Sequence, residues 1–218
     1  NLDESMNERG YLEGREMAST FNMMRDNDLI WSFVVNNYLL GRDPFPFDLL
    51  YWNSDSTRMP AAMHSFYLRQ MYLENNLIKP GGISLNGVPL DLHKIDLPVY
   101  IVAAREDHIA PWKSAFAATQ IYSGPIKFVL AASGHIAGIV NPPRPDSRYC
   151  HWINSASATT PEAWLDGATE CAGSWWPDWD KWVNKFAGGK KVPARQPGDG
   201  PLAALADAPG TYVKVRAI

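Results

Sequence analysis

Two short apolar runs restrict the fold of this chain more than any other feature of its sequence. Residues 97–104 (LPVYIVAA) and 126–132 (IKFVLAA) are continuous, rich in β-branched side chains, and followed closely by polar residues. Continuous apolar runs of this length are typical of parallel strands that are covered on both faces. A helix is predicted between them over 111–123, with Pro111 in its first turn. This strand–helix–strand order predicts a parallel pair in an α/β sheet.

The remaining sequence divides into helical and irregular stretches. Apolar residues recur at helical spacing in several segments, and helices are predicted over 11–25, 25–40, 60–78, 161–171 and 177–187. Thr160 is a predicted cap for the fourth of these. A small hairpin is expected after the Gly-Gly pair at 81–82, a loop over the proline-rich residues 141–160, and an irregular tail from residue 188.

Polar side chains follow both predicted strands. Asp107 comes three residues after the first strand, and His135 comes three residues after the second. Ligands of parallel α/β sheets bind at the carboxyl ends of strands, where a carboxylate can orient an imidazole that acts as a base. We therefore predict an Asp–His pair, with Glu106 as the alternative acid and His108 either lining the same pocket or lying at its rim. The order of Asp before His is that of the α/β-hydrolase triad, in which the nucleophile comes earlier.

The nucleophile of such a triad is missing from this sequence. No Gly-x-Ser-x-Gly motif or cysteine version of it is present, and Cys150 and Cys171 both follow His135 without flanking glycines. We therefore expect the chain to be the C-terminal piece of an α/β-hydrolase domain whose nucleophile lies in preceding polypeptide. The two thiols match no metal or disulfide pattern and are typical of a reducing cytoplasm.

Composition argues against several other classes of protein. The formal net charge is −3 and the isoelectric point is near 5.9, which disfavours a nucleic-acid-binding protein. No apolar run is long enough for a transmembrane helix, and no secretion signal is recognised. His64, His93 and His151 have no partner at metal-ligand spacing and are expected to be ordinary surface or core residues.

Four longer stretches resemble a known family. NNYLLGRDPFPFDLLYWNSDSTRMPAAMHSFYLR, LPVYIVAAREDHIAPW, SGHIAGIVNPP and GSWWPDW are similar to the C-terminal half of bacterial polyhydroxyalkanoate synthases of the single-subunit, class I type. The resemblance covers residues 1–187. It implies a helical cap over 1–90, the C-terminal part of an α/β-hydrolase core over 91–187, and the irregular tail over 188–218.

The resemblance also implies an activity. Enzymes of this family transfer (R)-3-hydroxyacyl groups from coenzyme A to a growing polyester, and need no cofactor besides the coenzyme A thioester substrate. Their nucleophile is a cysteine in a Gly-x-Cys-x-Gly box, which would precede this chain. Asp107 and His135 match the catalytic Asp and His, so His135 would accept the proton of the thiol and then of the 3-hydroxyl group. Asp107 would orient His135 or assist that hydroxyl.

Substrate contacts and partners follow from the same resemblance. Trp52 lies in the cap stretch that is expected to gate the active site and to pair subunits, His108 would contact the pantetheine arm, and Arg25 is either a phosphate contact or a solvated helix charge. The family implies a homodimer in the cytoplasm, at the surface of the polyester granule. The tryptophan-rich helices after residue 152 are expected to pack on the core.

Two other functions remain open from sequence. A serine hydrolase of the lipase or depolymerase type would share Asp107 and His135, and the residue in the missing nucleophile motif would separate the two activities. A non-catalytic, granule-associated subunit is the second alternative. As a polymerase fragment, the isolated chain is expected to be inactive, because neither resident thiol is placed as a nucleophile.

Overall fold

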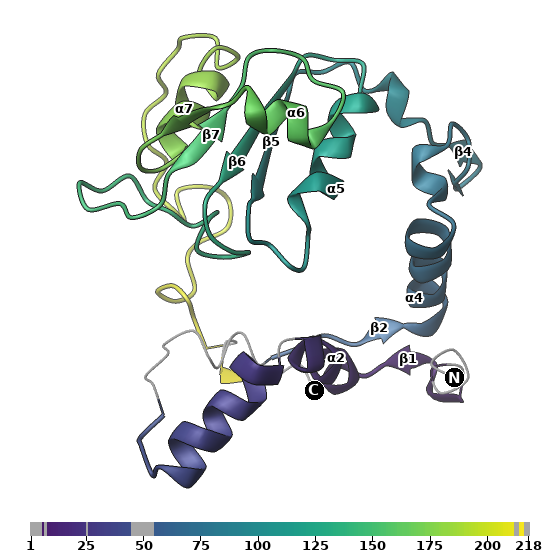
Figure 1. Ribbon diagram of the computed structural model, residues 1–218, viewed down its shortest axis with the longest axis vertical. Helices are drawn as coiled ribbons and strands as arrows, with labels where there is room; N and C mark the ends of the chain where they lie inside the picture. Colours follow the sequence, from purple (N-terminus) through teal and green to yellow (C-terminus); the bar gives the residue numbers. More distant parts are fainter. Residues whose placement is uncertain (1–5, 7, 25, 45–54, 212–213, 216–218) are drawn as a thin grey trace. The chain divides into compact units, whose positions relative to one another are not determined.

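The computed structural model describes residues 6, 8–24, 26–44, 55–211 and 214–215 (Figure 1). Contacts divide the chain into two compact units. The first is Asn1–Asn75 with Ala194–Ile218, and the second is Asn76–Pro193. Both units are mixed in secondary structure, and the second has the larger sheet. The assignment of residues 1–90 to a cap stays a prediction.

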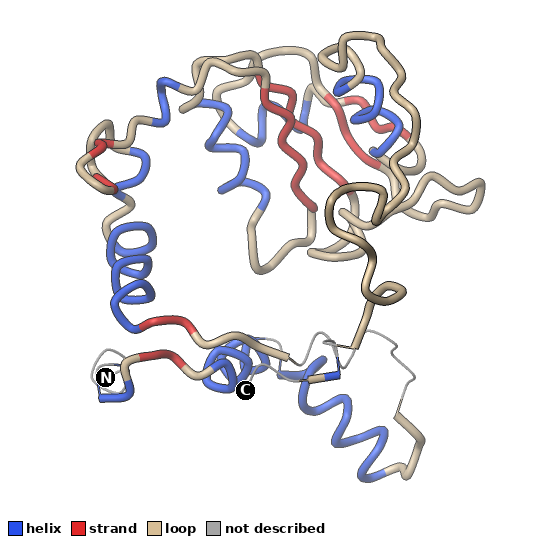
Figure 2. Tube along the Cα trace, turned by 180° about the vertical axis from the view of Figure 1, so that it is seen from behind, coloured by secondary structure: helices blue, strands red, loops and turns tan. Residues whose placement is uncertain are grey.

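A four-stranded sheet is the centre of the second unit (Figures 1 and 2). Strands β5 (Val99–Ala104) and β6 (Ile126–Ala131) pair in parallel over their whole length, which confirms the predicted strand–helix–strand unit. β7 (His151–Ile153) continues the sheet antiparallel to β6, and β8 (Thr169–Cys171) is antiparallel to β7. The sheet is therefore mixed, with its two longest and most apolar strands side by side.

One face of this sheet is covered by aromatic side chains from two short helices. The crossover between β5 and β6 contains α5 (Trp112–Phe116) and one 3₁₀ turn, η6 (Ala117–Gln120), and α6 (Pro161–Asp166) follows later. Phe128 of β6 meets the rings of Phe116 and Trp164 edge to face, at centroid distances of 5.2 and 4.9 Å. All three rings are nearly fully buried, so this cluster forms the main core of the unit.

The opposite face of the sheet is held by α7 (Trp176–Val183) through a polar network. Asp178 accepts hydrogen bonds from the Tyr100 hydroxyl of β5 at 2.9 Å and from the Lys127 ammonium of β6 at 2.6 Å. Burial opposes ionisation of Asp178, but the hydrogen bonds from Lys127 and Tyr100 outweigh it and lower the pKa of the carboxyl group. Because Tyr100 and Lys127 are paired in register, one carboxylate attaches α7 to both parallel strands.

Several predicted boundaries are wrong in this unit. The expected loop at 141–160 contains β7, and the expected helix at 161–171 ends at Asp166, with Gly167 as its C-cap, so that 169–171 forms β8. Thr160 does cap α6, accepting a hydrogen bond from the Ala163 amide at 3.2 Å. Pro111 precedes α5 as its N-cap and is not in its first turn. The helix at 177–187 is confirmed as α7, with its end at Val183.

The segment before β5 contains two 3₁₀ turns and the expected hairpin. η4 (Asn76–Ile78) precedes β3 (Ser84–Leu85) and β4 (Val88–Pro89), and η5 (Leu92–Lys94) follows. Asn86 and Gly87 connect the hairpin with φ values of 50° and 79°. Positive φ at both positions is what a tight two-residue hairpin turn requires, and Asn-Gly is the pair that adopts it most readily.

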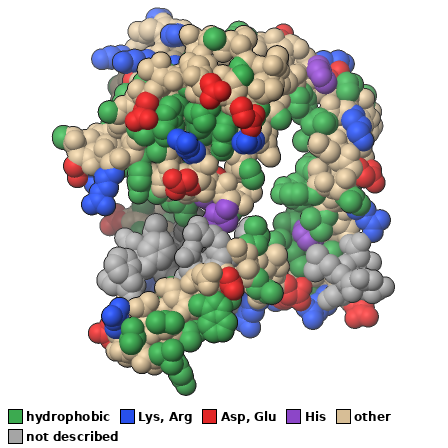
Figure 3. Space-filling model, viewed as in Figure 1, with side chains coloured by type: hydrophobic (Ala, Val, Ile, Leu, Met, Phe, Trp, Pro, Cys, Tyr) green, Lys and Arg blue, Asp and Glu red, His purple; other side chains and the backbone are tan. Residues whose placement is uncertain are grey.

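The first unit is mainly helical, as expected. Its helices are α2 (Gly14–Met24), α4 (Ala61–Tyr67) and the π-helical segments η1 (Asn27–Trp31), η2 (Val34–Leu39) and η3 (Leu68–Leu73). A two-stranded ribbon of β1 (Tyr11–Leu12) and β2 (Met59–Pro60) pairs antiparallel. Hydrophobic side chains lie at the surface of this unit (Figure 3), including Met23, Trp31, Phe33, Tyr38, Leu39 and Tyr72. No helix in the described part of the chain is long and apolar enough to cross a membrane.

Candidate active site

The loops that follow β5 and β6 are hydrogen-bonded to each other. The amide of Arg105 donates to the Ala131 carbonyl at 2.8 Å, and the amide of Glu106 donates to the Ser133 carbonyl at 2.9 Å. The parallel pairing of the two strands thus extends beyond their ends. Ser133 has a φ of 71°, so the chain turns sharply just before His135. These contacts hold the two strand ends at a fixed separation, from which both polar side chains emerge.

Asp107 and His135 meet at this edge of the sheet. Nδ1 of His135 lies 2.7 Å from Oδ2 of Asp107, although the two residues are 28 positions apart in sequence. The Asp107 side chain is only 6% exposed, whereas the His135 side chain is 47% exposed. The carboxylate is therefore enclosed by the protein, while the imidazole reaches solvent.

The second carboxylate oxygen of Asp107 is held by the backbone. Oδ1 accepts hydrogen bonds from the amides of Ile109 and Ala110, both at 2.8 Å. Burial raises the pKa of Asp107, but the bonds from Ala110, His135 and Ile109 together exceed that effect and leave the pKa below its ordinary value. Asp107 is thus an ionised acceptor at neutral pH.

The charge of Asp107 determines which nitrogen of His135 carries the proton. An ionised carboxylate only accepts hydrogen bonds, so Nδ1 of His135 must be the donor in this contact. In the neutral imidazole, Nε2 is then the unprotonated nitrogen with a free lone pair. No described residue hydrogen-bonds to Nε2. As far as the described residues extend, the arrangement therefore presents a base whose reactive nitrogen is not hydrogen-bonded.

The loop that carries His135 folds back on itself. The Gly138 amide donates to the Gly134 carbonyl at 3.0 Å, and the Val140 amide donates to the Ile136 carbonyl at 2.8 Å. A Cβ atom on Gly138 would lie 2.3 Å from the Ala132 carbonyl oxygen, so the turn requires glycine at this position. Sequence reasoning missed Gly138, although the spacing of two glycines around His135 in SGHIAG was a visible signal.

Among the described residues, neither Glu106 nor His108 forms a side-chain hydrogen bond with Asp107 or His135. Glu106, the alternative acid, is exposed, and the carboxylate that contacts His135 is that of Asp107. His108 lies exposed on the same loop. Trp52 and Arg25 lie outside the described residues.

Neither cysteine of this unit is positioned to act as the nucleophile. Cys150 and Cys171 are free and partly buried. Burial raises the pKa of the Cys150 thiol, and the neighbouring Glu170 carboxylate raises it further, so the reactive thiolate is disfavoured. The Cys171 thiol faces the Thr169 carbonyl at 3.9 Å. Within the described residues neither sulfur forms a hydrogen bond with His135.

His64, His93 and His151 lie in the core or at the surface, as predicted, and each has a local contact. His151 is buried with Nδ1 3.0 Å from the Gly173 carbonyl oxygen, and His64 is buried with Nδ1 3.0 Å from the sulfur of Met6. His93 pairs with Asp91 at 3.1 Å on the surface. The described residues contain no group of three or more His, Cys, Asp or Glu side chains that could hold a metal ion.

Comparison with known proteins identifies the family of this chain. The chain is 54% identical over 216 residues to the poly(3-hydroxyalkanoate) polymerase subunit PhaC of Rhizobium meliloti, and 54% identical over 216 residues to the poly(3-hydroxyalkanoate) polymerase of Methylorubrum extorquens. Each match covers 99% of this chain. The chain belongs to the poly(3-hydroxyalkanoate) polymerase family. The PhaC subunit of Cupriavidus necator is 49% identical over 94% of the chain.

The chain spans about a third of these polymerases, because each of the three matches covers 35% of the relative. No protein-family model matches the chain. The resemblance inferred from the sequence motifs is thus confirmed at the level of the polymerase family. The mixed α/β fold of the second unit is compatible with the expected hydrolase fold.

Proposed function

We propose that this chain supplies the base and the orienting carboxylate of an acyltransferase that polymerises (R)-3-hydroxyacyl groups from coenzyme A into poly(3-hydroxyalkanoate). The observation that carries the proposal is the 2.7 Å contact between His135 and Asp107 at the ends of two adjacent parallel strands. The names of the relatives support the polymer as the product. The fold would be the C-terminal part of an α/β-hydrolase.

The first half of the reaction would load the enzyme. Nε2 of His135 accepts the proton of a cysteine thiol that belongs to polypeptide outside this chain, and the thiolate attacks the thioester carbonyl of the substrate. A new carbon–sulfur bond forms, the bond to coenzyme A breaks, and the imidazolium returns the proton to the departing coenzyme A thiolate. Exchange between two thioesters is nearly balanced in energy, so this step needs no further driving group.

The second half would form the ester. The 3-hydroxyl oxygen of one acyl unit attacks the thioester carbonyl of another, a carbon–oxygen bond forms, and the enzyme thiolate leaves. His135 accepts the hydroxyl proton and transfers it to that thiolate. Asp107 stabilises the imidazolium in both steps because its charge faces Nδ1 directly. A role of Asp107 in assisting the hydroxyl directly is the alternative, but its enclosed position favours action through His135.

The proposed substrate, partners and location follow from the same family. The substrate is a coenzyme A thioester, with no further cofactor, and the partners are the growing polyester and a second subunit in a homodimer. His108, which is exposed on the Asp107 loop, is proposed as a substrate contact, and Trp52 and Arg25 are proposed as further contacts. The site of action would be the granule surface in the cytoplasm.

The test uses a chimeric polymerase, in which this chain replaces the matching segment of the Rhizobium meliloti polymerase. His135→Ala should reduce release of coenzyme A from 3-hydroxybutyryl-CoA by about 10³-fold or more, since the base is removed. His93→Ala is the matched control, because His93 is similarly exposed, at 49%, and also pairs with an aspartate. Equal activity of the His135 variant and the control would contradict the proposal and favour a non-catalytic subunit.

The isolated chain is proposed to be inactive on the same substrate. Neither thiol lies against His135, and the pKa of Cys150 is raised. Coenzyme A release by the chain alone that disappears in Cys150→Ala or Cys171→Ala would overturn this point. Analysis of the chimera's product separates the remaining alternative, because a hydrolase would yield free 3-hydroxybutyrate where a polymerase yields polyester.

A further inference from the structure

Two tryptophan side chains donate to a single carbonyl in the loop that carries His135. Nε1 of Trp175 lies 3.2 Å from the carbonyl oxygen of Ile139, and Nε1 of Trp176 lies 3.0 Å from the same oxygen. Both indoles belong to the start of α7, more than 35 residues further along the chain. A carbonyl oxygen has two lone pairs, so these two donors saturate it.

Ile139 is part of the compact turn that begins at Gly134. Its amide donates to the Ile136 carbonyl at 3.1 Å, and the Gly138 and Val140 amides close the turn on either side. Because the turn is bonded internally, a displacement of the Ile139 carbonyl moves the backbone of His135, four residues earlier. The imidazole itself has only Asp107 as a hydrogen-bond partner among the described residues. Its position toward a reacting group is therefore set largely by this backbone.

The two indoles are themselves anchored to the strands that carry the pair. The ring of Trp175 lies 6.1 Å from that of Tyr100 in β5, and Asp178, in the first turn of α7, bonds both Tyr100 and Lys127. The Trp176 amide donates to the Ser174 hydroxyl at 3.1 Å, and Ser174 is buried. The start of α7 thus connects β5, β6 and the His135 loop.

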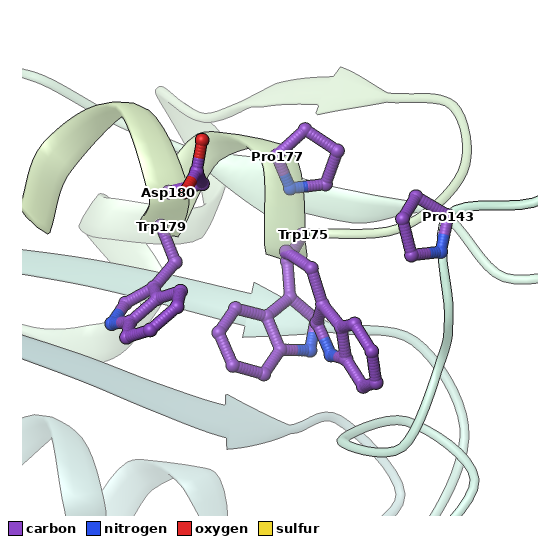
Figure 4. Close-up of a pocket in the computed structure, with 6 residues that line it drawn as sticks. Pro143, Trp175, Pro177, Trp179 and Asp180 are labelled. Atoms are coloured by element: carbon purple, nitrogen blue, oxygen red, sulfur yellow. The ribbon is translucent and has the colours of Figure 1, made fainter. Parts of the chain in front are cut away.

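Figure 4 shows Trp175 and Trp179 at a pocket beside the start of α7. Trp175 and Pro143, which follows the His135 loop, both line an apolar pocket of about 610 Å³. Trp179, one turn further along α7, lines the same pocket, and within the described residues it forms no hydrogen bond to the loop. The pocket therefore offers two tryptophans that donate to the loop and a third that serves as an internal control.

We propose that Trp175 and Trp176 are positioning residues for His135, acting through the Ile139 carbonyl. The catalytic consequence of this positioning rests on the proposed role of His135 as the base, whereas the structural effect on the His135 loop does not. Proton transfer and nucleophilic attack depend on placement to within about 1 Å, so a released loop should lower the rate of chemistry more than the binding of substrate.

The decisive variants remove the indole N–H and keep the ring. Trp175→Phe and Trp176→Phe, singly and together, are compared with Trp179→Phe in the chimeric polymerase. A further variant carries benzothienylalanine at both 175 and 176. This side chain preserves the bicyclic shape of tryptophan and replaces its N–H group by sulfur. We expect the double variants to lower kcat by about tenfold to a hundredfold, with KM within about twofold of the parent. Trp179→Phe should leave both constants unchanged.

A second readout does not depend on turnover. The ¹⁵N signals of the His135 ring in this chain should show a single Nδ1-protonated tautomer, and exchange broadening or a mixture of tautomers in the double variants. Unchanged kcat together with an unchanged His135 signal in the benzothienylalanine chain would overturn the inference. Altered ring signals in a chimera whose activity does not depend on His135 would instead overturn the proposed function and leave the positioning role intact.

Discussion

The replacement of Asp107 by asparagine separates the charge of this residue from its shape. In the native protein Oδ1 accepts two backbone amides and Oδ2 accepts the His135 ring proton. Asparagine has one acceptor oxygen and one donor NH₂ group. If its oxygen takes the Oδ1 position, the two backbone bonds survive and NH₂ faces Nδ1. The opposite orientation would set NH₂ against two N–H groups, so the first orientation should prevail.

This orientation reverses the tautomer of His135. With an N–H donor opposite it, Nδ1 must accept, and the proton of the neutral ring moves to Nε2. Nε2 then no longer has a free lone pair and cannot remove a proton. In serine proteases the equivalent Asp→Asn change lowers kcat by about 10⁴ through the wrong tautomer. We expect a loss of similar order in the chimeric polymerase, with the loop geometry preserved.

The same structure gives the expected change in stability. A hydrogen bond to a charged group contributes about 1.5–3 kcal/mol and a neutral one about 1 kcal/mol, so weakening the two amide bonds costs about 1–4 kcal/mol. Asp107 is almost fully enclosed, so solvent does not replace these bonds. Burial of the charge opposes ionisation, and its removal offsets part of the cost. The net loss in free energy of unfolding should be about 1 kcal/mol.

The assay measures tautomer, stability and rate on matched proteins. Selective ¹⁵N-histidine spectra of Asp107→Asn report which nitrogen of His135 is protonated, urea unfolding gives the stability, and coenzyme A release by the chimera gives the rate. Asp91→Asn, which alters the surface pair with His93, is the control. A variant that keeps the proton on Nδ1 would refute the tautomer reasoning. A reversed tautomer with normal turnover would instead refute the role of Nε2 as the base.

Three further predictions concern the support of the site, each measured as the free energy of urea unfolding. Gly138→Ala should destabilise the protein by about 1–3 kcal/mol, because the added Cβ meets the Ala132 carbonyl, whereas Gly200→Ala has open space and should be neutral. Trp164→Ala should cost about 3–5 kcal/mol, since its buried ring contacts two others. Asp178→Asn should cost about 1–3 kcal/mol at pH 7. Because the pKa of Asp178 is lowered in the folded protein, the stabilisation by its carboxylate is present above about pH 4 and is lost as the pH falls through the native pKa. The difference in stability between the native protein and Asp178→Asn should therefore shrink at pH 3. A difference that stays constant with pH would contradict the assignment.

The parallel pair and its polar ends were predictable from local sequence. β5 and β6 are continuous apolar runs, and a right-handed crossover leaves few ways to arrange them other than side by side. Once they are parallel, the residues after each strand must share one edge of the sheet. Asp107 and His135 could therefore be paired without knowledge of the rest of the chain. The sequence did not show why Asp107 and not Glu106 meets His135. In the structure the amides of Ile109 and Ala110 turn around the Asp107 carboxylate and hold it in place.

The antiparallel extension of the sheet was not predictable in the same way. β7 and β8 have only three residues each and contain His151, Glu170 and Cys171 among apolar neighbours. Neither run shows a periodicity that identifies a strand. They become strands because β6 offers an unpaired edge, which is a non-local cause. Gly167, the C-cap that ends α6 early, was a local signal for this part of the sheet that sequence reasoning overlooked.

The contacts that form the Asp107–His135 pair and those that position it differ in sequence separation. Asp107 and His135 are 28 positions apart, with the crossover helix and β6 between them. The contacts of Trp175 and Trp176 with Ile139 span 36 and 37 positions and enclose β7, α6 and β8. The chemical identity of the site therefore comes from the two strands that the sequence reveals most clearly. Its placement comes from the antiparallel strands and from α7, whose position depends on them. A substitution that weakens the pairing of β7 with β8 should act on His135 through α7, although it changes no residue within reach of the imidazole.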